Sequence, residues 1–123
     1  MSRHERAVAA EDLLSRRFDA LADGTRRRIL EILRTRGEMT AGAMAAEFPE
    51  ITRPAVSRHL RVLREAGLVE VVPVGREMRY GLAADAIEAL WHNWFAAFAV
   101  ISEGALRRLR SRVEAQPNDR GRH

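Results

Sequence analysis

The chain has 123 residues, 46% of them hydrophobic and 6% aromatic, which fits one helical globular domain and argues against a disordered chain or a β-sandwich. It has no cysteine, no apolar run near the roughly 20 residues that a membrane span needs, and no signal-peptide pattern at its N-terminus. We therefore expect a cytoplasmic protein without disulfides, thiolate metal ligands or membrane contact. The net charge of +4 comes from 21 basic residues that are all arginine, and residues 53–79 hold a local excess of arginine over glutamate, which suits a phosphate backbone.

The N-terminal part predicts an amphipathic helix after a polar segment. Residues 1–10 are polar and are expected to be flexible. From Glu11 onward, apolar residues recur at spacings of four and three, as one face of a helix requires: Leu14, Phe18 and Leu21. The sequence therefore predicts a domain over residues 11–114 that opens with a helix ending near Ala22.

Two shorter helices follow, each with its own start and stop signals. Asp23 is suited to cap a helix that Gly37 ends. The arginine run at residues 26–28 of this helix is expected to be a solvated face, with a phosphate contact as the alternative. Thr40 is suited to cap the next helix, AGAMAAEF, which Pro49 closes.

Residues 51–69, ITRPAVSRHLRVLREAGLV, predict the central helix of the chain. Thr52 is suited to cap its start, Pro54 fits its first turn, and Gly67 supplies the left-handed residue that ends it. One side of this helix is apolar: Val56, Leu60 and Leu63. The other side is polar and basic: Ser57, Arg58, Arg61 and Glu65. Two short helices joined by a tight turn, the second with arginines facing outward, predict a helix-turn-helix whose second helix enters the major groove of DNA.

After Gly67 the periodicity becomes strand-like. Residues 68–72 and 78–82 favour strands, and the intervening PVGR predicts a turn, so this part is expected to form a short β-hairpin. A hairpin after a recognition helix makes a winged helix, in which Arg76 and Arg79 are placed to reach a phosphate or the minor groove. The alternative is that both arginines only keep an edge strand soluble.

Asp85 is the predicted cap of one long C-terminal helix of about 30 residues. Its apolar residues follow each other at spacings of four and three: Ile87, Trp91, Trp94, Phe98, Ile101 and Ala105. This is more apolar surface than a terminal helix of a small domain buries alone, so we expect a second copy of the chain to cover it. An aromatic ligand pocket and an intrachain core are the alternatives. Residues 115–123 are expected to be a flexible tail.

Two histidines lie in predicted helices, where each is a candidate ligand or DNA contact: His92 and His59. Glu88 and His92 have the spacing of two metal ligands on one helical face, but two ligands do not make a site, so no metal is expected. His59 lies at the edge of the apolar stripe of the central helix. A half-buried histidine bonded to a backbone or phosphate group is therefore favoured over a base-reading one.

Three stretches of the chain resemble the winged-helix repressors of the ArsR/SmtB family: ALADGTRRRILEIL, TRPAVSRHLRVLREAGLVE and GREMRYGL. The resemblance covers about Phe18 to Leu82. It implies a mainly α fold with one small β-hairpin, the winged helix-turn-helix. The elements are expected in the order of three helices, the recognition helix, the hairpin wing and a long last helix. The resemblance also implies a homodimer, built on the first and last helices, that binds a pseudo-palindromic double-stranded DNA operator and represses transcription.

The resemblance assigns DNA contacts by position: Thr52, Arg53, Ser57, Arg58, His59 and Arg61 on the central helix, with Arg76 and Arg79 on the wing. The dimer interface expected from the apolar residues of the two outer helices comprises Leu14, Phe18, Ile87, Trp91, Trp94, Phe98 and Ile101.

The chain departs from the metal-sensing members of that family. Those members carry a cysteine pair before the recognition helix, or an Asp/His/His/Glu set on the last helix. Here the first place reads TAGAMAAEF, and Ile87 stands where the second set wants a histidine. The sequence resembles the metal-independent branch, so no cofactor is expected and the effector stays open. Two alternatives are a winged-helix protein-docking module and a repressor with a metal or ligand site on the last helix. An enzyme is not expected, because no nucleophile set or carboxylate pair stands out.

Overall fold

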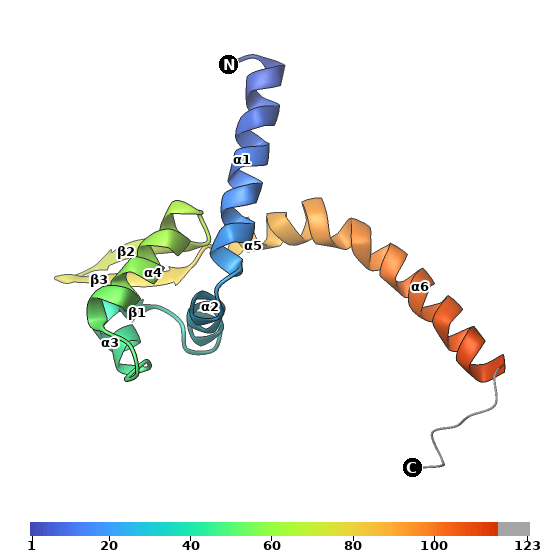
Figure 1. Cartoon of the computed structure of the whole chain (residues 1–123). Coiled ribbons are helices and arrows are strands. Elements are labelled where there is room, and N and C mark those ends of the chain that lie inside the picture. Colours follow the sequence, from blue (N-terminus) through green and yellow to red (C-terminus); the bar gives the residue numbers. More distant parts are fainter. Residues whose placement is uncertain (116–123) are drawn as a thin grey trace, which may run out of the picture. The chain divides into compact units, whose positions relative to one another are not determined.

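The computed structural model describes residues 1–115, without the side chains of residues 97 and 99–103. The chain divides into two compact units, Met1–Ile87 and Glu88–His123. Figure 1 labels the elements, which in chain order are α1 (Arg3–Leu21), α2 (Gly24–Arg36), β1 (Met39–Thr40), α3 (Ala41–Ala46), α4 (Arg53–Glu65), β2 (Val69–Val74), β3 (Glu77–Leu82), α5 (Ala84–Leu90), the π-helical segment η1 (Trp91–Phe95) and α6 (Ala96–Ala115). The predicted winged helix-turn-helix is confirmed: α3 and α4 form the helix-turn-helix, and β2 and β3 form the wing.

The predicted start signals of α2, α3 and α4 are confirmed. Each helix is capped by a side-chain oxygen that accepts a hydrogen bond from a backbone N–H three residues later. The donors and distances are Arg26 to Asp23 at 3.0 Å, Ala43 to Thr40 at 3.1 Å, and Ala55 to Thr52 at 3.2 Å. Gly37 ends α2 as predicted, and Gly67 follows α4 with a φ of 72°, so the predicted left-handed residue after α4 is also present.

The N-terminal boundary differs from the expectation. Helix α1 begins at Arg3 rather than near Glu11, and Ser2 caps it by accepting a hydrogen bond from the N–H of Glu5 at 3.1 Å. The segment expected to be polar and flexible is therefore helical in its larger part. The apolar periodicity could not show this, because residues 1–13 are exposed and carry no buried face.

The sheet has three antiparallel strands in the order β1-β3-β2. The pairing of β2 with β3 runs from Val69 opposite Leu82 to Val74 opposite Glu77, so the turn holds only Gly75 and Arg76. Gly75 has a φ of 63° and Arg76 has no positive φ, the pattern of a type II′ hairpin turn. The strands thus extend into the stretch predicted as a turn.

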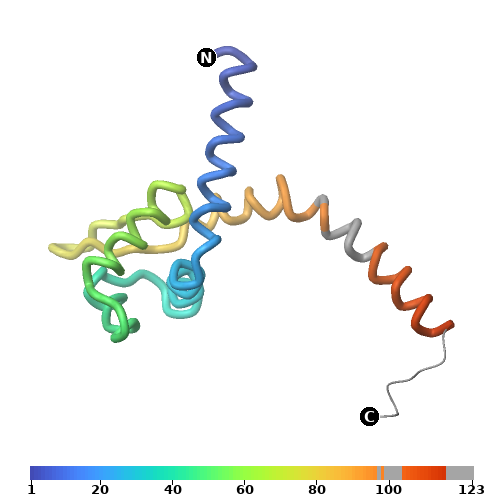
Figure 2. The backbone as a smooth tube through the Cα atoms, in the orientation of Figure 1, coloured from blue at the N-terminus to red at the C-terminus, as the bar shows by residue number. Residues whose placement is uncertain are grey.

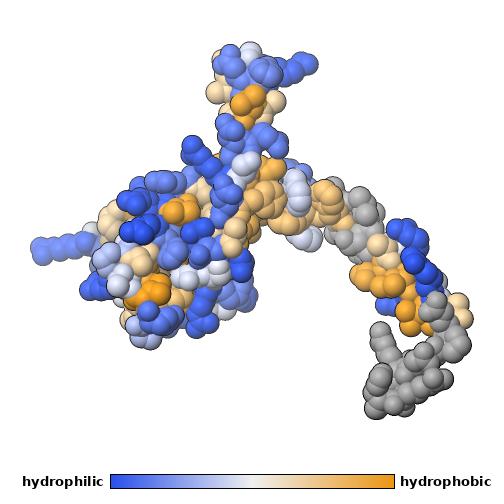
Figure 3. Space-filling view, viewed as in Figure 1, coloured by the Kyte–Doolittle hydropathy of each residue, from blue (hydrophilic) through white to orange (hydrophobic). Residues whose placement is uncertain are grey.

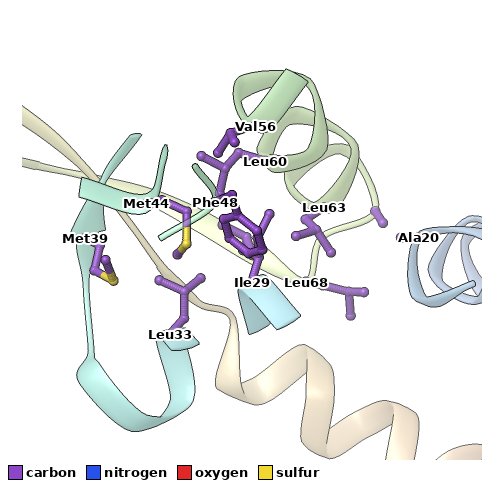
Figure 4. Packing of buried hydrophobic residues seen from close by; sticks show 12 residues of the cluster. Ala20, Ile29, Leu33, Met39, Met44, Phe48, Val56, Leu60, Leu63 and Leu68 are labelled. Atoms are coloured by element: carbon purple, nitrogen blue, oxygen red, sulfur yellow. The ribbon is translucent and has the colours of Figure 1, made fainter. Parts of the chain in front are cut away.

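The hydrophobic core of the first unit lies between α2, α3, α4 and the sheet. In Figure 4 the side chains of Ile29, Phe48 and Leu60 point into this one cluster. The predicted stripe of α4 is confirmed, since Val56, Leu60 and Leu63 are each 0% exposed. Burial of this stripe fixes which face of α4 turns outward. Figure 2 shows the chain passing from α4 directly into the β2–β3 hairpin.

The last part of the chain was predicted as one long helix capped by Asp85 and interrupted at Gly104, and the structure differs in two respects. Helix α5 begins at Ala84, so Asp85 lies in its first turn. The π-helical segment Trp91–Phe95 then separates α5 from α6. A single wider turn changes the spacing of apolar residues very little, so the sequence pattern did not reveal it. Within this turn the rings of Trp94 and Phe95 pack edge to face, with their centres 5.1 Å apart.

The predicted tail, residues 115–123, lies outside the described residues from residue 116 onward. None of the helices in the described chain combines the length and hydrophobicity needed to cross a membrane.

Candidate nucleic-acid interface

The outward face of α4 carries exposed polar and basic side chains. Six of the eight predicted DNA contacts are exposed: Thr52, Arg53, Ser57, Arg58, Arg61 and Arg76. The first five have this exposure because the opposite side of α4 is buried and its N-terminal end is open. The structure therefore brings the first five together on one helix.

Two arginines of this face have guanidinium groups without a partner inside the protein. The side chains of Arg58 and Arg61 make no hydrogen bond or ion pair with another residue in the described part of the chain. Each of these groups carries five N–H donors in a planar fork that fits a guanine edge or a phosphate. Helix α4 thus presents unneutralised positive charge with its hydrogen-bonding capacity unused.

The wing adds a second basic position at its tip. Arg76 lies in the two-residue turn and is exposed, and Figure 3 shows the tip of the hairpin as a hydrophilic projection. Arg79 is different, because its Nη2 donates to Oε1 of Glu77 at 2.9 Å. Since exposed pairs of this kind contribute little free energy, Arg79 is available to exchange this partner for a phosphate.

His59 faces the start of α2 and its side chain is only 22% exposed. Its Nδ1 lies 3.3 Å from Nη1 of Arg26 and 3.9 Å from Oδ2 of Asp23. The expected half-burial is present, but the partner is a guanidinium group rather than a backbone group. The backbone N–H of Arg26, which bonds to the Asp23 carboxylate, lowers the pKa of Asp23 below its ordinary value, and the charges of His59 and Arg26 act in the same direction.

The arginine run of α2 was expected to be a solvated face. Arg27 and Arg28 are exposed as expected, whereas Arg26 is half-buried. Arg26 donates from Nε to the carbonyl of Ala20 at 2.8 Å and from Nη2 to that of Asp19 at 3.0 Å. Arg27 donates to the carbonyl of Leu21 at 2.6 Å. The guanidinium of Arg28 lies 5.8 Å from the centre of the Phe48 ring.

The contacts of Arg26 and Arg27 occupy carbonyls in the last turn of α1. Carbonyls at this end of a helix lack the partners that the following turn would supply, and of those contacted here only that of Asp19 also accepts a backbone hydrogen bond within the described chain, from the N–H of Ala22. The sequence holds one signal for this arrangement: the connection between α1 and α2 is very short, so arginines in the first turn of α2 start close to those carbonyls.

The predicted dimer residues fall into three groups. Leu14 and Phe18 of α1 are half-buried, and Ile87 packs against the core of the first unit. In the second unit Trp91 is 51% exposed and Phe98 is 49% exposed. Trp94 is half-buried, with its ring centre 4.5 Å from that of Phe98. The side chain of Ile101 lies outside the described residues.

Helix α6 carries further exposed apolar side chains: Leu106, Leu109 and Val113. Figure 3 shows exposed hydrophobic surface on α1 and, in the other unit, on α6. Apolar surface of this extent is typical of a protein interface.

The chain is similar to known transcriptional regulators. Residues 21–72 match the helix-turn-helix domain family. The chain is 45% identical over 75 residues to the HTH-type transcriptional regulator Rv2034 of Mycobacterium tuberculosis, spanning 61% of this chain and 68% of the relative. It is 36% identical over 81 residues to the transcriptional repressor SdpR of Bacillus subtilis, spanning 66% of this chain and 87% of the relative. An ArsR-like transcriptional regulator from Rhodococcus sp. RHA1 is 30% identical, with a TM-score of 0.66 over 89% of this chain and 98% of that chain.

The chain belongs to the ArsR family. Members of the ArsR family are DNA-binding transcriptional regulators, so the protein is a regulator and not an enzyme. A second solved structure is similar as well, the homodimeric winged helix-turn-helix DNA-binding domain of a possible ArsR-family regulator from Mycobacterium bovis. It is 29% identical, with a TM-score of 0.61 over 84% of this chain and 90% of that chain.

His92, in the π-helical segment, is the candidate metal ligand of the last helical part. His92 Nε2 lies 3.6 Å from Oε1 of Glu88, and both side chains are exposed. The described residues contain no group of three or more histidine, cysteine, aspartate and glutamate side chains placed to hold a metal ion. Glu88 and His92 therefore form an exposed contact on one helical face and supply only two of the ligands that a metal site requires.

Proposed function

We propose that the protein is a homodimeric repressor that binds a pseudo-palindromic operator in double-stranded DNA through the major groove. The observation that carries this proposal is the outward row of Ser57, Arg58 and Arg61 on α4, whose other side is anchored by fully buried core residues. A rigid helix with free guanidinium groups on one face is the arrangement that reads base edges in the major groove.

The eight predicted contacts take different roles in this proposal. Ser57, Arg58 and Arg61 face the base edges, because they lie on the exposed face of the helix. Thr52 and Arg53 contact DNA from the N-terminal end of α4, where the helix dipole favours a phosphate. The remaining three contact the DNA backbone: His59, Arg76 and Arg79.

The homodimer is proposed on the apolar side chains of the outer helices. Leu14 and Phe18 of α1, with Trp91, Trp94 and Phe98 and the predicted Ile101, supply the surface that the partner copy covers. The homodimeric relative from Mycobacterium bovis supports this assembly. We assign DNA binding and dimerisation to residues 11–114, and we place the protein in the cytoplasm, where its operator is.

Repression follows from occupancy of the operator, and the repressor from Bacillus subtilis supports this direction of regulation. A protein-docking role is less favoured, because the outer face of α4 carries none of the exposed aromatic or methionine side chains that form the centre of protein interfaces.

The test is selection of bound duplexes from a random pool at physiological salt. We expect a palindrome whose half-sites lie about 34–36 Å apart, one helical turn of DNA, or a multiple of that distance. The selected duplex should bind at least about a thousandfold more tightly than a scrambled duplex of the same composition. Equal binding of all duplexes would contradict the proposal, as would a protein that stays monomeric on the operator.

A further inference from the structure

Two arginines outside the DNA-facing surface connect α4 to α1. The first is Arg26, whose guanidinium donates to the α1 carbonyls of Asp19 and Ala20 and reaches Nδ1 of His59 on α4 at 3.3 Å. A guanidinium group has donors and no acceptor, so Nδ1 of His59 is the acceptor in this contact. Arg26 thus bridges the end of α1 and the middle of α4.

The second arginine lies on α1 and contacts the C-terminal end of α4. Arg17 of α1 donates from Nε to the carbonyl of Ala66, which ends α4, at 3.0 Å. Its Nη2 lies close to Gly67, where a Cβ atom would be 3.2 Å away. The missing side chain of Gly67 therefore leaves the space that this guanidinium occupies, and the positive charge lies at the negative end of the α4 dipole.

The two attachment points on α4 are well separated. His59 and Ala66 lie about 10 Å apart along the helix axis, at roughly 1.5 Å per residue. The buried stripe of α4 fixes its outward face against the core. One contact with α1 would fix a single point of α4 on that helix, whereas two separated contacts also fix the direction of α4 relative to α1. Both contacts lead to α1, the helix on which we place part of the dimer interface.

We propose that Arg17 and Arg26 are positioning residues that hold α4 at a fixed direction on α1 and thereby set the half-site spacing that the dimer accepts. The inference rests on the proposed homodimeric repressor. In a two-fold dimer, a pivot of α4 on each α1 changes the separation of the two recognition helices. A dimer with loose recognition helices accepts several spacings, and a dimer with fixed helices accepts one.

The test compares the full-length protein with Arg17→Met and Arg26→Met, which keep most of the aliphatic side chain and remove the donors. Arg16→Met is the matched control, because Arg16 is exposed on the same helix and its side chain makes no hydrogen bond or ion pair with another described residue. The chain has no cysteine, so Arg64→Cys in the exposed last turn of α4 gives one site for a nitroxide label.

Two measurements are made on each variant. Pulsed electron resonance on the free dimer gives the distribution of distances between the two labelled α4 helices. Binding assays give affinities for the selected operator and for duplexes with one base pair added or removed between the half-sites. We expect a narrow distribution for the wild type and the control, with a penalty of about tenfold for either change in spacing. Both methionine variants should broaden the distribution and reduce that penalty to about threefold or less.

The outcomes separate the two proposals. Unchanged distance distributions and spacing penalties in both variants would overturn the inference. Loss of folding in both variants would also overturn it, because the contacts would then serve stability alone. A wild-type dimer without a preferred duplex would contradict the proposed repressor, while the label distances would still test whether Arg17 and Arg26 hold α4. A monomeric wild-type protein would overturn both.

Discussion

The guanidinium group of Arg53, the first residue of α4, lies against Gly42 of α3. A Cβ atom on Gly42 would come within 3.0 Å of Nη2 of Arg53, so the glycine leaves room for the arginine at the turn between the two helices. The position of a proposed DNA contact on α4 therefore depends on the absence of a side chain on α3.

We predict that Gly42→Ala weakens operator binding without lowering stability. Alanine favours the helix by up to about 1 kcal/mol relative to glycine, while its methyl group displaces the end of Arg53. We expect operator affinity to fall by about fivefold, equivalent to roughly 1 kcal/mol, with an unchanged or higher free energy of unfolding. Gly24→Ala is the control, because its Cβ atom would meet Arg27 at an ordinary 3.7 Å. Unchanged operator affinity in Gly42→Ala would contradict a DNA contact by Arg53 that depends on the space at Gly42.

Arg58→Ala should reduce both affinity and base preference. Arg58 is exposed on the face of α4 assigned to base edges, and we expect its loss to cost about 1–3 kcal/mol in operator binding. Repeating the duplex selection with this variant should relax the preference at one position of each half-site. A uniform loss of affinity with the same preferred sequence would assign Arg58 to the phosphate backbone instead.

Arg76→Ala should weaken binding to all sequences alike. Arg76 lies at the wing tip and is assigned to the DNA backbone, so we expect the dependence of log affinity on log salt concentration to become less steep by about 0.9, the value for one phosphate. Arg3→Ala removes an exposed arginine far from the proposed interface and should leave the slope unchanged. A change in base preference in Arg76→Ala would contradict a contact limited to the DNA backbone.

Asp23→Asn should remove an acid-dependent part of the stability. The folded protein lowers the pKa of Asp23 from its ordinary value of 3.8, chiefly through the backbone N–H of Arg26. A depressed pKa stabilises the folded state above about pH 4, and this stabilisation is lost as the pH falls through the folded value. Asparagine also caps helices, so the variant keeps the cap and loses the charge. Denaturant unfolding between pH 7 and pH 2.5 should show the wild type losing more stability than Asp23→Asn. Parallel curves would exclude a role for this carboxylate.

Trp91→Ala should weaken the homodimer. Trp91 is 51% exposed in the single chain and belongs to the proposed interface, where a large aromatic side chain contributes strongly to association. We expect the dimer dissociation constant to rise at least about thirtyfold, equivalent to roughly 2 kcal/mol, in sedimentation experiments. Asn93→Ala, an exposed polar change in the same π-helical segment, is the control. An unchanged dissociation constant would move the interface away from Trp91.

The helix-turn-helix was predictable because its signals are local. Thr52 caps the residues that directly follow it, Gly67 ends the helix next to it, and Val56 and Leu60 show their shared face by spacing alone. The exposed positions of α4 followed from that stripe without knowledge of the tertiary structure. This part of the candidate site was therefore accessible from the sequence.

Other features depend on packing that no local pattern encodes. Arg26 appeared as one member of a charge run, because its acceptors are backbone carbonyls, which every residue has. Strand β1 has two residues, too few for an alternation of polar and apolar side chains. The wider turn at residues 91–95 left the apolar spacing of the last helix nearly intact. Each was missed because its cause lies in contacts between elements or in backbone geometry.

Gly67 has consequences for which substitutions the chain tolerates. Its φ of 72° disfavours most side chains, and Nη2 of Arg17 lies 3.2 Å from where a Cβ atom would be. Asparagine adopts a positive φ more readily than other residues with a side chain, but its Cβ atom would still crowd the guanidinium group of Arg17. The two restrictions are independent of DNA, so in a saturation library selected only for folding, glycine should dominate at this position. Asparagine at position 67 should be tolerated first in chains that also carry a smaller residue in place of Arg17.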